Sequence, residues 1–142
     1  KIFVEIKPSK ISFNELNEMV ETGVISKLNT HFLGFYPNIV KSLIKRFDIP
    51  ATLSIIPAFF DYDYKKINSF LERSKSFGIS QHIDSKKSMN LIKKFKEDGK
   101  YCIAWTVNNK KYMRDLTELG VDAIITDNPK KLMKVIKEKR NG

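Results

Sequence analysis

Several features are scarce in this sequence, and each scarcity excludes a class of protein. The 142 residues include one cysteine, Cys102, which excludes a disulfide-bonded scaffold. No run approaches the roughly 18 consecutive apolar residues of a membrane-spanning helix. Glycine is sparse, with six residues, and neither a G-x-G-x-x-G sequence nor a P-loop follows any expected strand. A dinucleotide-binding fold or a nucleoside triphosphatase is therefore not indicated.

The residues that are present are those of a folded, basic protein. Apolar residues make up 42% of the chain and phenylalanine alone accounts for ten, so intrinsic disorder is excluded. The length fits a single domain over residues 1–142. Lysine and arginine outnumber acidic residues by 26 to 16, but they are spread along helix-like segments. We interpret them as solvated helix faces and predict no nucleic-acid partner. Binding of nucleic acid or anionic lipid through the net charge of +10 is the alternative.

Apolar periodicity predicts strands and helices in strict alternation. Ser12 and Glu15 form a capping-box pattern that predicts the start of the first helix, and Pro129 marks the start of the last. The expected strands are Lys1–Lys7, Thr30–Tyr36, Ala51–Ile56, Ile79–Ile83, Tyr101–Val107 and Val121–Thr126. The later helices are expected at Asn38–Phe47, Tyr64–Phe77, Ser85–Glu97, Lys110–Leu119 and Lys130–Lys139.

Six strand–helix units indicate an α/β fold with a parallel sheet and helical crossovers. Two arrangements satisfy this pattern, an open doubly wound sheet and a (β/α)8 barrel. The barrel needs eight units and typically about 250 residues, so this chain is two units short. Length alone therefore favours the open sheet or a fragment of a barrel. An incomplete barrel by itself would leave its strand edges unpaired.

Two polar side chains stand on one face of the first expected strand. Glu5 and Lys7 are two residues apart, about 7 Å along an extended chain. They suit either an ion pair exposed to water or a metal or phosphate site, since βα folds place their chemistry at the carboxyl ends of parallel strands. Trp105 similarly suits a core position or a site, and Asp127 and Asn128 before Pro129 suit a helix cap or a site.

Three segments together resemble the glycerophosphodiester phosphodiesterase family, a family of (β/α)8 barrels. They are Val4-Glu5-Ile6-Lys7, Ala104-Trp105-Thr106-Val107-Asn108 and Gly120-Val121-Asp122-Ala123-Ile124-Ile125-Thr126-Asp127-Asn128-Pro129. Their order and spacing match the third, seventh and eighth strands of that barrel. The resemblance implies that the chain is the C-terminal portion of a partial TIM (β/α)8-type barrel, with about six βα units and the first two strands absent.

The resemblance also implies roles for individual residues. Glu5 matches the metal-binding glutamate, Lys7 the lysine that contacts the substrate phosphate, and Trp105 the tryptophan that lines the glycerol side of the pocket. Phe35 is expected to line the same mouth, next to Gly34, which replaces a serine common in the family. We expect Asp127 and Asn128 to shape the last loop and the start of the last helix.

The family's catalytic histidines and two of its three metal-binding carboxylates match no position in this chain. His31 falls at the amino-terminal side of its strand, and His82 matches no catalytic position, so we expect no catalytic residue here. The divalent cation that the family uses, Mg2+ or Ca2+, would find one ligand, Glu5, and an incomplete site. The start at Lys1, inside a strand, is expected to be a cut edge of the barrel.

The leading hypothesis is therefore an inactive fragment of an enzyme that hydrolyses a small glycerophosphodiester to glycerol 3-phosphate and an alcohol. The alternative is a degenerate barrel that acts as a binding or interaction module. Either version would need its open edge covered, by self-association or by an N-terminal segment. The sequence leaves localisation open between the cytoplasm and a membrane.

Overall fold

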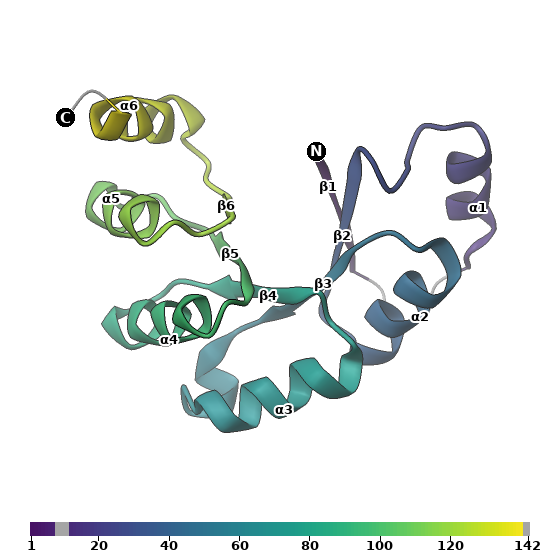
Figure 1. The fold of residues 1–142 in the computed structure, drawn as a ribbon, viewed down its shortest axis with the longest axis horizontal. Coiled ribbons are helices and arrows are strands. Elements are labelled where there is room, and N and C mark those ends of the chain that lie inside the picture. Colours follow the sequence, from purple (N-terminus) through teal and green to yellow (C-terminus); the bar gives the residue numbers. More distant parts are fainter. Residues whose placement is uncertain (8–11, 141–142) are drawn as a thin grey trace. The chain divides into compact units, whose positions relative to one another are not determined.

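The computed structural model describes residues 1–7 and 12–140, and it shows strands and helices in alternation (Figure 1). The strands are β1 (Ile2–Ile6), β2 (Thr30–Gly34), β3 (Ala51–Ile55), β4 (Gly78–His82), β5 (Tyr101–Trp105) and β6 (Ala123–Ile124). The helices are α1 (Asn14–Glu21), α2 (Pro37–Phe47), α3 (Tyr64–Ser74), α4 (Lys86–Glu97), α5 (Lys110–Leu119) and α6 (Pro129–Arg140), with a short 3-10 helix, η1 (Pro57–Phe60).

The strand order in the sheet follows the chain from β1 to β6. The pairs β1–β2, β2–β3 and β5–β6 are parallel, as crossover helices require. The predicted fold class is confirmed: six parallel strands alternate with helices, as in a partial (β/α)8 barrel. The chain forms two compact units, residues 1–54 with 65–78 and residues 55–64 with 79–142, which are described separately below.

The first unit contains β1, β2 and β3 and the helices α1 and α2. The register pairs Ile2 with Thr30 and Ile6 with Gly34, so β1 and β2 end level with each other. Every residue of β2 and β3 is buried, as in a parallel sheet covered on both faces, and the buried residues include the polar Thr30, His31, Thr52 and Ser54. Helix α2 packs Ile39, Val40 and Leu43 inward at helical spacing.

His31 lies in the core of the first unit. Its side chain is 1% exposed, and its Nε2 atom lies 2.6 Å from the Thr52 hydroxyl. The rings of Phe3 and Phe77 pack on it at centroid distances of 5.5 and 5.6 Å. Burial, with a smaller contribution from the positive charge of Lys1, lowers the pKa of His31 to about 4. His31 is thus a structural residue, at the amino-terminal side of its strand as predicted.

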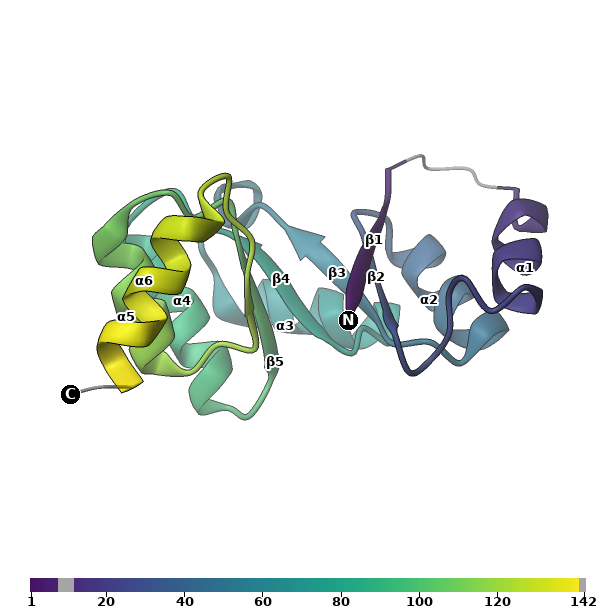
Figure 2. The same cartoon turned by 90° about the horizontal axis from the view of Figure 1, so that it is seen from above.

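The second unit contains β4, β5 and β6, η1, and the helices α4, α5 and α6. Ser85 precedes helix α4 as its N-cap, and its hydroxyl accepts a hydrogen bond from the Ser88 amide in a reciprocal capping box. Helix α5 begins with Asn109, whose side-chain oxygen accepts from two backbone amides, and it ends at Gly120 in the left-handed conformation. Figure 2 shows α5 and α6 side by side.

Three boundary predictions were wrong for identifiable reasons. Helix α1 begins at Asn14 behind Phe13, whose ring packs on Phe47, so Ser12 and Glu15 form no capping box. Helix α3 ends at Ser74, because Lys75 adopts a left-handed backbone with φ 58°.

Strand β6 has two residues instead of the six predicted. Asp122 leaves the strand because its carboxylate accepts hydrogen bonds from the Cys102 amide and the Lys96 ammonium, both at 2.8 Å. Within the described residues, the structure contains no helix of the length and apolarity that a bilayer-spanning segment requires.

The buried His31 makes the stability of the fold depend on pH. Its pKa of about 4 in the folded chain lies below the 6.5 of an unperturbed histidine, so the unfolded chain takes up the proton first as the pH falls. Stability contributed by the neutral ring is complete above pH 6.5 and is lost as the pH falls toward 4. Between pH 7.5 and pH 5 this group should cost about 2 kcal/mol of unfolding free energy, measurable by urea titration.

The matched variant is His31→Asn, which we expect to lose about 2 kcal/mol less stability between these pH values than the unaltered chain. An NMR titration of the His31 ring gives its pKa directly, whatever the stability of the variants. A value near 6.5 would contradict the interpretation.

Candidate functional site

Glu5 and Lys7 lie at the carboxyl end of β1, on one face of the strand. The Lys7 Nζ atom is 3.8 Å from the Glu5 Oε2 atom, and the two side chains are 79% and 38% exposed. This distance permits an ion pair but exceeds a hydrogen bond. An exposed pair of this kind contributes about 0–1 kcal/mol, so a phosphate or a cation can displace one partner with little loss. The structure shows the water-exposed ion pair that the sequence allowed.

Phe35 follows β2 in the same unit. Because Ile6 is in register with Gly34, the residues that come next, Lys7 and Phe35, leave the two strands at the same edge. Phe35 is half-buried. A Cβ atom placed on Gly34 would lie 3.4 Å from the Val40 Cγ2 atom and 3.6 Å from the Ile6 carbonyl oxygen. These are ordinary contacts for a Cβ atom, so the backbone at Gly34 does not require glycine on grounds of space.

Trp105 is the last residue of β5, in the second unit, and it is half-buried. Its ring packs against that of His82, the last residue of β4, at a centroid distance of 4.9 Å and an angle of 50°. The Ile83 amide donates a hydrogen bond to the Trp105 carbonyl at 2.7 Å, which holds the two strand ends together. Trp105 and His82 therefore form one aromatic pair at the carboxyl ends of β4 and β5.

Asp84 and Tyr62 complete this group of side chains, and sequence reasoning missed both. The Tyr62 hydroxyl donates to Asp84 at 3.0 Å, and the Ser85 hydroxyl donates to it at 2.8 Å. Burial acts to raise the pKa of the Asp84 carboxyl, but these hydrogen bonds and the nearby His82 keep the pKa below its ordinary value. The position of Asp84 directly after a buried strand was the signal that could have found it.

Asn108 connects the loops that follow β5 and β6. Its side-chain amide donates to Asp127 at 2.7 Å, and its side-chain oxygen accepts from the Thr126 hydroxyl at 2.9 Å and from the Asp127 amide at 3.0 Å. Asn128 accepts from the Lys131 amide at 3.0 Å and so caps α6. Asp127 and Asn128 thus shape the last loop and helix start, as expected.

The side chains present do not fit a complete divalent-cation site. Among residues 1–7 and 12–140, no three His, Cys, Asp or Glu side chains are grouped so that they could hold a metal ion. Mg2+ and Ca2+ take six or more oxygen ligands, and Glu5 supplies two oxygens at most. No reaction step is therefore assigned to a metal held by this chain alone.

The structure brings some of the predicted site residues together. Glu5, Lys7 and Phe35 share the carboxyl edge of the first unit, whereas Trp105 belongs to the second unit, with His82 as its neighbour. Parallel strands with aromatic and charged side chains at their carboxyl ends are the arrangement that α/β-barrel enzymes use for binding and catalysis. The class defined by these features is that of the α/β-barrel enzymes.

Comparison with known proteins gives the family. The family model of the glycerophosphoryl diester phosphodiesterases matches residues 57–131, more than half of the chain. The chain belongs to the glycerophosphoryl diester phosphodiesterase family, a family of phosphodiester hydrolases. The matched residues include Trp105 and the Thr126-Asp127-Asn128-Pro129 segment. No curated protein matches the sequence of this chain.

Solved structures agree on the fold. A provisionally assigned glycerophosphoryl diester phosphodiesterase from Agrobacterium tumefaciens has 18% identity and a TM-score of 0.76, covering 99% of this chain. A glycerophosphodiester phosphodiesterase from Parabacteroides distasonis has 19% identity and a TM-score of 0.71, covering 97%. A phosphodiesterase from Oleispira antarctica, in complex with the product sn-glycerol-3-phosphate, has 20% identity and a TM-score of 0.58, covering 76% of this chain and 42% of its own. This chain spans 59% and 58% of the first two structures.

The Asn108 network predicts a measurable effect on stability. Asn108→Ala removes three hydrogen bonds between the last two strand ends, and we expect it to lower the free energy of unfolding by about 1–2 kcal/mol in urea titrations. Asn90→Ala, an exposed position within α4, is the matched control and should lose nothing. Equal stability of the Asn108→Ala variant and the unaltered chain would show that these bonds do not hold the loops.

Proposed function

We propose that this chain is the C-terminal portion of a glycerophosphodiester phosphodiesterase, which hydrolyses a glycerophosphodiester to glycerol 3-phosphate and an alcohol. The family match over residues 57–131 carries this proposal. The similar Oleispira antarctica phosphodiesterase binds sn-glycerol-3-phosphate as its product, and we extend that ligand class to this chain.

Lys7 is proposed to contact the substrate phosphate. Its side chain is 79% exposed, and Glu5 at 3.8 Å is a weak partner, so a phosphate can approach without breaking a strong interaction. An ammonium beside the phosphate stabilises the negative charge that develops on its oxygens during attack. Glu5 is proposed to be one ligand of a Mg2+ or Ca2+ ion, whose other ligands this chain does not supply.

Trp105 and Phe35 are proposed to contact the glycerol part of the substrate. Both rings are half-buried, so each is held by the fold on one side and open on the other. An aromatic face of this kind packs against the C–H groups of a small alcohol and excludes water from them. Hydroxyl groups of the substrate then need polar partners elsewhere in the complete site.

Residues 1–142 are proposed to be inactive by themselves. Hydrolysis of a phosphodiester needs a base for the attacking water and an acid for the departing alcohol. His31 is buried against Phe3 and Phe77, away from solvent. His82 lies against Trp105 with Asp84 4.0 Å away, and it matches no catalytic position of the family.

The open edge of β1 is proposed to be covered in the working protein. Ile2 is 54% exposed, and Phe3 and Val4 are only half-buried. Either an N-terminal segment or a second copy of this chain would cover them. A degenerate barrel that serves only as an interaction module remains the second candidate, and this exposed strand is the observation that favours it.

Activity measurements test the proposal directly. We expect the 142-residue chain to release no glycerol 3-phosphate from a glycerophosphodiester with Mg2+ or Ca2+ present. A chain extended at its N terminus by the two missing strand–helix units, with the family's catalytic histidines and its two other metal-binding carboxylates, should release it in a metal-dependent way. Metal-dependent release by residues 1–142 alone would show that this division of residues is wrong.

Product binding tests the role of Lys7 without catalysis. We expect sn-glycerol 3-phosphate to bind the extended chain at least tenfold more weakly when Lys7 is replaced by Met, as measured by titration calorimetry, because a charged hydrogen bond to phosphate is worth about 1.5–3 kcal/mol. Lys41→Met, an exposed lysine on α2, is the matched control and should bind as before. Equal affinities of the two variants would remove Lys7 from the site.

A further inference from the structure

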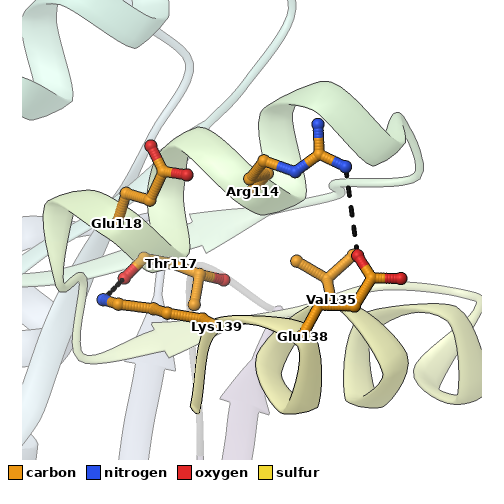
Figure 3. A pocket seen from close by; sticks show the side chains of 6 residues that line it. All are labelled: Arg114, Thr117, Glu118, Val135, Glu138 and Lys139. Atoms are coloured by element: carbon orange, nitrogen blue, oxygen red, sulfur yellow. Dashed lines mark hydrogen bonds and ion pairs between the residues drawn. The ribbon is translucent and has the colours of Figure 1, made fainter. Parts of the chain in front are cut away.

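Helix α6 carries lysines on two of its faces, and the two faces differ in whether these lysines have interaction partners. On the face toward α5, Glu138 and Lys139 both have partners, and Figure 3 shows their contacts with Arg114 and Thr117. Glu138 lies 4.0 Å from Arg114 and 3.5 Å from Lys110, and the Lys139 ammonium donates to the Thr117 carbonyl at 2.8 Å. These contacts attach α6 to the rest of its unit, above the buried side chain of Val135.

The outer face of α6 consists of Lys130, Met133, Lys134 and Lys137. These positions are spaced by three, one and three residues, so they form one stripe along the helix. Together with Pro129 they line a shallow depression in the surface. Among residues 1–7 and 12–140, the three ammonium groups have no ion-pair partner, and Met133 is 53% exposed.

We propose that this outer face of α6 binds the surface of an anionic lipid membrane. Three unpaired ammonium groups on one stripe are complementary to a layer of lipid phosphates and carboxylates. Met133 supplies an apolar side chain between them that can enter the boundary between headgroups and acyl chains. Long lysine side chains around it can keep their charges among the headgroups.

A membrane fits this face better than a nucleic acid does. Arginine, which binds phosphate and guanine through two parallel hydrogen bonds, is absent from the four positions of the stripe, and so are aromatic rings for stacking on bases. The exposed apolar side chain of Met133 finds no apolar group to contact on a phosphate backbone, but it can contact acyl chains in a lipid layer.

Vesicle binding by the full 142-residue chain tests the proposal and needs neither catalysis nor a metal ion. The probes are vesicles of pure phosphatidylcholine and vesicles with 30% phosphatidylserine, at about 0.1 M salt. Each lysine near an anionic surface changes affinity by about fivefold. We expect binding to the anionic vesicles only, and at least a tenfold loss when Lys130, Lys134 and Lys137 are all replaced by Gln.

The control replaces three exposed lysines of the first unit, Lys41, Lys45 and Lys75, by Gln. Both triple variants have the same net charge, +7 in place of +10, so a purely global attraction would weaken both equally. The proposal predicts that the control binds within about twofold of the unaltered chain. It also predicts a further loss for Met133→Ser, most visible at high salt, where the electrostatic part is screened.

Each other outcome overturns the proposal. No binding to anionic vesicles would do so, as would equal losses in the two triple variants. Tighter binding to duplex DNA or RNA than to vesicles at the same salt, lost in the α6 triple variant, would assign the face to nucleic acid instead. Thermal unfolding of each variant verifies folding, and the substituted side chains are all exposed, so their midpoints should match that of the unaltered chain.

Discussion

Parallel pairing of strands is the constraint on which the site depends. Each strand runs in the direction of its neighbour, so a helix must return the chain after every strand, and the carboxyl ends gather at one edge within each unit. Lys7 and Phe35 leave β1 and β2 at the same level for this reason, and Trp105 and Asn108 stand beside the loop that follows β6. The same constraint buries β2 and β3 on both faces, which leaves the strand ends as the places where polar side chains reach solvent.

The alternation of strands and helices could be predicted from the sequence because the spacing of apolar residues follows burial. In this chain the strands are buried on both faces and the helices on one, so the spacing changes from one element to the next. The ends of individual helices and strands were harder to predict, because each end depends on a few specific contacts. The packing of Phe13 on Phe47 moves the start of α1 away from Ser12, and the side chain of Asp122 replaces ladder hydrogen bonds and shortens β6. Neither contact leaves a periodic signal, since both join residues more than 19 positions apart.

Residues of the candidate site could be proposed from the sequence only where a residue type is unusual for its surroundings. Glu5 and Lys7 stand out in an apolar strand, and Trp105 is the single tryptophan of the chain. Tyr62 and Asp84 do not stand out, because tyrosine and aspartate are ordinary in loops. Their relation exists only once η1 and the end of β4 are placed in one unit, where the Tyr62 hydroxyl reaches the Asp84 carboxylate. The buried His31 shows the converse: the residue type most often catalytic is held here between two aromatic rings.

Polar residues that stabilise the structure already make their hydrogen bonds within the chain, whereas those available to a ligand do not. The Asn108 Oδ1 and Asp122 Oδ2 atoms each accept two hydrogen bonds at 2.8–3.0 Å, and breaking these contacts to bind a ligand would cost the fold as much as the ligand returns. The Glu5 and Lys7 charges face each other at 3.8 Å in water, where their attraction is small and easily replaced. The outer lysines of α6, Lys130, Lys134 and Lys137, have no ion-pair partner at all within the part of the chain that the structure describes. Charges held this loosely contribute little to the fold, so their free energy of interaction is available for binding.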